Sequence, residues 1–254
     1  MSAWSGLARR AALVAANVLG AAAFVWPFLV PALPLGVHER DAPIFLVLIS
    51  GCLLLVLALE LDRALGPKQI ALLGVLGAAM VALRLPGYVA GFSAMFLVVL
   101  VGGAAFGPTF GFLLGAIGTF ASGLFVGGIG PWLPFQMVSV GWVGLGAGML
   151  PRSGRWRVPA LAAYGVLVGY LFGAVMNLWA WPFIGSGTPI GWAPGAGLAG
   201  NLRRYLAYYL ATSLAWDTFR AVGNGLLVVV LGGPLLRTLD RAARRLRLDV
   251  QVAV

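Results

Sequence analysis

Ionisable residues inside apolar segments are the first candidates for chemistry, because a charge within a membrane is costly and is usually kept for a function. Asp217 is the one acidic residue that lies within a predicted span and not at the end of one, and Arg220 follows three residues later on the same helical face. The pair could simply neutralise itself so that a charged helix can enter the bilayer. It could instead form the polar floor of a ligand pocket, on a face that Asn224 extends.

Several kinds of catalysis lack the residues that they need. The single histidine, His38, falls in a predicted outer loop, and the single cysteine, Cys52, falls in an apolar run. The sequence therefore predicts no histidine base, metal cluster or intrachain disulfide. Neither a GxxxxGK[ST] phosphate loop nor a GxSxG nucleophile elbow occurs. Ser122 and Ser139 have no base in evident reach and are interpreted as helix-packing residues. We expect a protein that is not an enzyme and holds no cofactor.

Aromatic and amide side chains gather near the predicted outer ends of the spans. Aromatic faces with a few hydrogen-bonding groups are typical of a pocket for a mostly flat organic molecule. The tryptophans, which include Trp179 and Trp192, could also be an anchoring belt at the membrane interface. The Gly- and Pro-rich segment Gly185–Arg204 could close over such a pocket or be a plain connector. The predicted ligand-binding residues are Tyr88, Trp132, Gln136, Asn177, Trp181, Asp217 and Arg220.

The composition indicates which elements position these residues. Hydrophobic residues make up 61% of the 254 positions, charged residues 9%, and the mean hydropathy is +0.98. These values predict an all-α integral membrane protein. The eight predicted spans are Ala11–Val30, Ile44–Leu61, Ile70–Leu85, Tyr88–Phe106, Thr109–Val126, Phe135–Leu150, Pro159–Phe183 and Leu206–Leu236.

The net charge of +10 lies mainly at the ends of the apolar segments and predicts the topology. If both termini are cytoplasmic, twelve basic residues lie inside and four outside, as the positive-inside rule requires. The predicted parts are a two-helix extension over residues 1–69, a six-helix domain over 70–236 and a basic cytoplasmic tail over 237–254. Leu235–Leu248 is expected to be a helix that rests on the inner leaflet or contacts a cytoplasmic partner.

Two rows of glycines predict close helix packing. Gly107, Gly111, Gly115 and Gly118 share one helical face, and Gly141, Gly144 and Gly148 repeat the device in the next span. Such rows let two helices approach closely, but they indicate no particular function.

The chain contains, in order, FGPTFGFLLGAIGTFASGLF, the predicted outer loop GPWLPFQM and VGLGAGMLP, followed by two more spans and a basic tail. By these motifs, the chain from Ile70 onward resembles the S components, the substrate-binding membrane subunits of energy-coupling factor (ECF) vitamin transporters. The two predicted helices before Ile70 depart from the family pattern.

The resemblance implies a six-helix domain that captures a vitamin or related micronutrient outside a bacterial-type plasma membrane. It would deliver the ligand with a transmembrane coupling subunit and two cytoplasmic ATPases. The wide aromatic rim favours cobalamin, and riboflavin, folate or another vitamin stay open as alternatives. In the family, small residues four apart on the first core helix contact the coupling subunit. The matching positions here are Ala71, Gly74 and Ala78, although Val75 interrupts the usual alanine pair. The alternatives are a self-sufficient secondary transporter or channel for a small organic solute, a membrane enzyme or a membrane scaffold.

Overall fold

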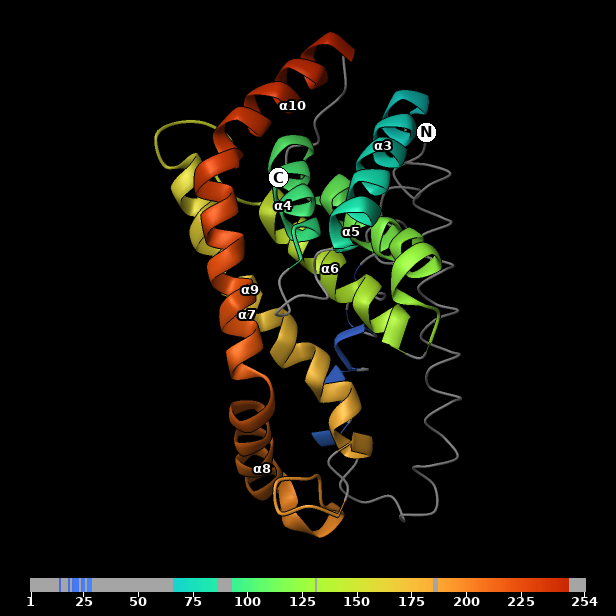
Figure 1. The fold of residues 1–254 in the computed structure, drawn as a ribbon, viewed down its shortest axis with the longest axis vertical. Coiled ribbons are helices and arrows are strands. Elements are labelled where there is room, and N and C mark those ends of the chain that lie inside the picture. Colours follow the sequence, from blue (N-terminus) through green and yellow to red (C-terminus); the bar gives the residue numbers. More distant parts are fainter. Residues whose placement is uncertain are drawn as a thin grey trace. The chain divides into compact units, whose positions relative to one another are not determined.

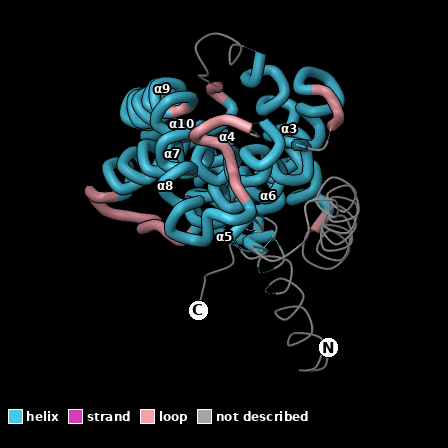
Figure 2. The backbone as a smooth tube through the Cα atoms, turned by 90° about the horizontal axis from the view of Figure 1, so that it is seen from below, coloured by secondary structure: helices cyan, strands magenta, loops and turns pink. Residues whose placement is uncertain are grey.

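The computed structural model describes residues 66–85, 93–130, 132–184 and 187–246, and nine positions between Val14 and Phe28. These residues form helices joined by short loops, and no strand occurs among them (Figure 2). The predicted all-α fold is therefore confirmed for this part of the chain. Tyr88, His38, Cys52 and the predicted span Ile44–Leu61 lie outside the described residues.

The helices α3, α5, α6 and α7 follow the predicted spans closely (Figure 1). α4 begins only at Met95, later than the predicted start of its span at Tyr88. π-helical turns at Gly123–Gly127 and Val228–Gly232 extend α5 and α9, and the 3-10 turn Pro194–Ala196 precedes α8. The helices are α3 (Pro67–Arg84), α4 (Met95–Phe106), α5 (Pro108–Ser122), α6 (Trp132–Gly148), α7 (Arg157–Ile184), α8 (Gly197–Thr212), α9 (Leu214–Leu227) and α10 (Gly233–Leu246).

The last predicted span, Leu206–Leu236, is not a single helix. α8 ends at Thr212 and α9 begins at Leu214, and Ser213 between them leaves the helical conformation with φ −127° and ψ −25°. The apolar run continues across this break, so hydropathy alone did not mark it.

Four helical segments of the described part are long and apolar enough to cross a bilayer. They are Pro67–Arg84, Pro108–Gly127, Arg157–Ile184 and Leu214–Arg245. α4, with 12 residues, and α6, with 17, are apolar but shorter. The eight-span topology with both termini inside stays a prediction.

The chain divides into two compact units. One contains Leu65–Ala174 and Thr212–Val254, and the other contains Met1–Ala64 and Val175–Ala211. The division passes through α7, so its two halves are described with different partners below.

The core of the larger unit is built around α4. All twelve of its residues are buried, and it packs against α3, α5, α6 and α10. A helix that is apolar all round needs such an environment. α4 ends at Phe106. Gly107 follows it with a φ of 97°, which suits glycine, and Pro108 then begins α5 at its first helical position.

The predicted close packing of α5 and α6 is confirmed. A Cβ atom on Gly111 would overlap the carbonyl group of Gly144, and a Cβ atom on Gly144 would overlap that of Gly111. The backbones of the two helices therefore touch, which only glycine permits at these positions. Gly118, on the same row, lies instead against Met80 of α3.

Candidate functional site

A polar cluster joins the end of α3 to α5 and α6. Arg84 donates one hydrogen bond to Ser122 Oγ (2.6 Å) and another to Gln136 Oε1 (2.9 Å). The Ser122 hydroxyl in turn donates to the carbonyl of Thr119 (2.9 Å). Ser122 thus accepts a hydrogen bond from the Arg84 guanidinium group. This contact corrects the interpretation of Ser122 as a helix-packing residue. Gln136, a predicted ligand residue, lies in this cluster.

The arrangement fixes which groups Gln136 can offer. Because its Oε1 accepts from Arg84, its Nε2 amide keeps two donors for another partner. Gln136 is half-buried, and Trp132, one helical turn earlier on α6, is 38% exposed. The cluster can therefore present an aromatic face and hydrogen-bond donors to a ligand with acceptor oxygens.

The π-helical turn after α5 leaves room for this cluster. A Cβ atom on Gly127 would meet the Arg84 guanidinium at 2.7 Å. Arg84 was not predicted as a site residue; it was only one of the four basic residues that the predicted topology places outside. The signal that could have identified it is its place in the last turn of an apolar helix, where an arginine must find polar partners.

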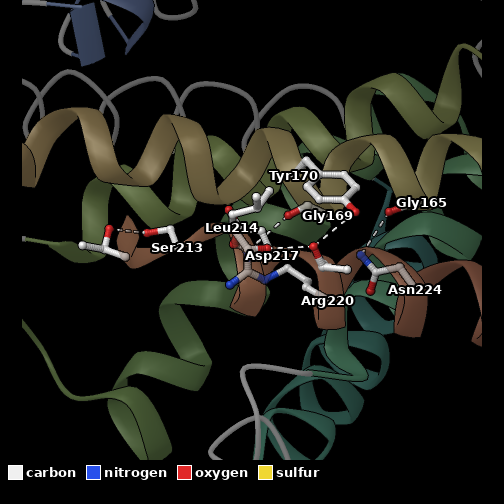
Figure 3. A network of polar contacts seen from close by, with 10 residues as sticks. Gly165, Gly169, Tyr170, Ser213, Leu214, Asp217, Arg220 and Asn224 are labelled. Carbon is white, nitrogen blue, oxygen red and sulfur yellow. Dashed lines mark hydrogen bonds and ion pairs between the residues drawn. The ribbon is translucent and has the colours of Figure 1, made fainter. Parts of the chain in front are cut away.

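Asp217 and Arg220 form an ion pair on α9 (Figure 3). The Asp217 side chain is 2% exposed and the Arg220 side chain 14%. Arg220 also donates to the carbonyl of Gly169 on α7 (3.2 Å) and lies over the ring of Phe172, 5.1 Å from its centroid. The pair therefore joins two helices, whatever else it contacts.

A third row of glycines, on α7, makes room for the polar face of α9. Gly165, Gly169 and Gly173 follow at intervals of four residues. A Cβ atom on Gly173 would overlap the Asp217 carboxylate, and one on Gly169 would overlap Ala221. Asn224, fully buried, donates to the carbonyl of Gly165 (3.2 Å; Figure 3). The predicted continuation of the polar face to Asn224 is confirmed.

Trp181 lies in the smaller unit, within an aromatic core. It is 0% exposed and packs with Trp192, Tyr205 and Tyr208. The indole N–H of Trp181 donates to the carbonyl of Ile190 (2.9 Å). These contacts give Trp181 a structural role, and its role in ligand binding stays a prediction. Asn177, one turn earlier on α7, is half-buried.

Hydrogen bonds within the segment Gly185–Arg204, which was interpreted as a cover over a pocket or a plain connector, hold much of its described part. α8 begins at Gly197, inside the predicted loop Gly185–Arg204. Asn201 accepts from the amide N–H of Ala193 (3.0 Å) and donates to its carbonyl (2.9 Å). Arg204 donates to the carbonyls of Pro189 (3.0 Å) and Gly191 (3.1 Å). The glycines and prolines of this segment therefore belong to a hydrogen-bonded turn and to the start of the helix that follows it.

The predicted docking residues share the exposed face of α3. Ala71, Gly74 and Ala78 are all exposed, as are Val75 and Ala82. A Cβ atom on Gly74 would meet nothing within 4 Å. The face is consequently shallow and lined by small side chains, a surface that another helix can approach closely.

The fold and these sites define a polytopic helical membrane protein with polar groups held between its helices. A family model described as "ECF transporter, substrate-specific component" matches residues 68–232, which is more than half of the chain. The chain belongs to this family, whose members are transport subunits of the membrane and not enzymes. Comparison with curated proteins gives no match, and comparison with solved structures gives none either.

Proposed function

We propose that this chain captures a vitamin or related micronutrient from outside the cell, with cobalamin favoured among the candidates. A transmembrane coupling subunit and two cytoplasmic ATPases then drive its delivery inward. ATP hydrolysis takes place on those partners, and the membrane is the plasma membrane of a bacterial-type cell.

The cluster of Arg84, Ser122 and Gln136 beside Trp132 carries the ligand-binding part of this proposal. It combines a cation, two amide donors and an exposed aromatic side chain at one end of α3 and α6. A ligand that suits it has a flat ring and carbonyl, carboxylate or phosphate oxygens. Cobalamin, with its amide carbonyls and phosphate, meets this requirement, and so do riboflavin and folate; cobalamin is favoured for the width of the predicted aromatic rim. Tyr88, Asn177, Trp181, Asp217 and Arg220 remain proposed contributors.

The exposed face of α3 supports the coupling part of the proposal. Its row of small side chains at Ala71, Gly74 and Ala78 suits a second helix packed closely against it. We propose that this second helix belongs to the coupling subunit, because members of the family transport their substrates together with such partners.

Transport in proteoliposomes tests the function. The full chain, the coupling subunit and both ATPases are reconstituted, and ATP-dependent uptake of labelled cyanocobalamin, riboflavin and folate is measured. We expect uptake of one compound that stops without ATP. Absence of uptake of all three by an assembled complex would contradict the proposal, and uptake driven by an ion gradient alone would favour a self-sufficient transporter.

Two pairs of variants separate binding from coupling. Gln136→Glu would pair with Arg84 and lose both amide donors, so we expect about tenfold or weaker binding of the transported compound. Ser139→Ala is its control, because Ser139 bonds to Phe135 within its own helix (2.8 Å). Ala78→Leu should retain ligand binding and lose ATP-driven uptake, whereas Ala163→Leu, at an exposed position on α7, should retain both.

A further inference from the structure

The exposed side of α10 carries a concentration of positive charge. Arg237, Arg241, Arg244 and Arg245 are all exposed. The acidic residue of this helix, Asp240, points its carboxylate to Arg157, with contacts of 2.6 Å and 3.0 Å. Asp240 is therefore neutralised on the inner side of α10, and the four exposed arginines have no acidic counterpart on their own helix.

The helix before α10 places it at a membrane surface. α9 has 14 residues and the π-helical turn that follows has 5. At about 1.5 Å per residue they extend roughly 28 Å, close to the ~30 Å thickness of the hydrocarbon layer. If the chain crosses the bilayer along α9 and this turn, α10 therefore begins close to a membrane surface, among the lipid headgroups.

Contacts with the bundle hold α10 in that region. The π-helical turn and Pro234 lie where α10 leans away from the line of α9 and over the end of α4 (Figure 1). Leu236 and Ala243 are buried, and α10 packs against α4. Arg157 also donates to the carbonyl of Ala104 in the last turn of α4 (3.4 Å). The arginine side is therefore held in one orientation.

An open cavity of about 500 Å³ lies on this side of α10, and its described lining residues are Thr238, Arg241, Ala242 and Arg245. Their spacing of three, four and seven residues puts them on one helical face. Thr238 donates to the carbonyl of Pro234 (3.1 Å) and accepts from Arg241 (3.4 Å), which orients both side chains. The exposed wall of the cavity is mostly apolar and carries two guanidinium groups. This combination suits an amphipathic molecule with a phosphate group, because arginine binds phosphate through paired N–H donors.

We propose that this cavity binds the phosphate of an anionic phospholipid headgroup. The lipid is the source of the phosphate because α10 continues directly from a membrane-spanning helix and stays beside the bundle. A zwitterionic headgroup binds less well, since its own cation is repelled by the arginines.

Native mass spectrometry of the full chain in detergent tests the proposal with three probes: phosphatidylglycerol, phosphatidylcholine and inorganic phosphate. We expect retention of phosphatidylglycerol over phosphatidylcholine, and no displacement of bound lipid by millimolar phosphate. Displacement by phosphate would assign the site to a soluble anion and overturn the proposal, as would equal retention of the two lipids.

Two double variants that each remove two positive charges distinguish a specific lipid site from a general electrostatic attraction of the arginines to anionic lipid. Arg241→Gln/Arg245→Gln removes the cavity arginines and should weaken retention of phosphatidylglycerol about 30-fold. Arg237→Gln/Arg244→Gln removes two arginines outside the described lining and should weaken it severalfold less. Equal losses would overturn the proposal. Ala242→Trp fills the cavity and keeps every arginine, so it should also lose the lipid; full retention by this variant would contradict a site here even if the arginine variants fold poorly.

Discussion

The α5–α6 and α7–α9 interfaces are both built on glycines four residues apart, yet the glycines accommodate different groups. At Gly111 the neighbouring atoms belong to the backbone of Gly144, whereas at Gly173 they belong to the carboxylate of Asp217. The first interface is apolar and brings two backbones together. The second makes space for an ion pair and an amide. A glycine row therefore predicts close approach, and the facing helix decides whether the approach serves packing or the burial of polar groups.

The largest effect is expected at the ion pair. Arg220→Ala leaves the Asp217 carboxylate buried without its cation and should lower the free energy of unfolding by about 3–5 kcal/mol. Reversible unfolding in mixed micelles measures this loss. The double variant Asp217→Asn/Arg220→Gln removes both charges and should recover most of it. If the single variant is no less stable than the double one, the pair does not stabilise the α7–α9 interface.

The next largest effect is expected where two backbones touch. Gly111→Ala should lower the free energy of unfolding by up to about 3 kcal/mol, because the new methyl group meets the Gly144 carbonyl. Gly74→Ala is the matched control on an exposed helical face. It should be neutral or stabilise by up to about 1 kcal/mol through helix propensity. A similar loss in both variants would argue against close packing as the cause.

A rescue experiment sharpens the contrast between the interfaces. Gly173→Ala should destabilise by about 1–3 kcal/mol in the native chain, since its methyl group meets the Asp217 carboxylate. In an Asp217→Ala/Arg220→Ala background the same change should cost less than about 0.5 kcal/mol, as a double-mutant cycle would show. No side-chain truncation should rescue Gly111→Ala, because its obstacle is backbone. Rescue at both sites, or at neither, would remove the distinction.

The smallest effect is expected at Asn224. Its amide donates to the Gly165 carbonyl (3.2 Å), but its Oδ1 is buried with no partner among the described residues. The stabilisation from this hydrogen bond and the cost of burying the unpaired oxygen partly offset each other. Asn224→Ala should therefore lower the free energy of unfolding by only about 0.5–1 kcal/mol. A loss above about 2 kcal/mol in the same unfolding assay would show that Asn224 takes part in more than this one bond.

Local spacing predicted those features that depend on one helix or on two consecutive helices. The pairing of Asp217 with Arg220 follows from a separation of three residues, and the contact of α5 with α6 from two successive glycine rows. The family was also predicted correctly, because its motifs lie close together in the sequence, along α5 and α6.

Features that depend on distant residues were not predicted. Arg84 bonds to residues 38 and 52 positions away, and nothing beside it in the sequence indicates those partners. Trp181 was expected at an outer rim, but Tyr205 and Tyr208 of α8 bury it. The first part of α8, before Leu206, was not predicted, because it follows glycines and prolines whose turn is stabilised by Asn201 and Arg204. In each case a tertiary contact outweighed the local composition.

The complete burial of α4 has a consequence for how the protein is made. Twelve residues rise only about 18 Å, well short of a bilayer, so α4 cannot span the membrane by itself. Among the helices that it packs against, α3 is synthesised before it, whereas α5, α6 and α10 are synthesised after it. Arg157, which bonds to its last turn, follows 53 residues after Ala104. We therefore expect α4 to wait at the insertion machinery until α5 and α6 emerge, so that the three helices enter the membrane as one unit.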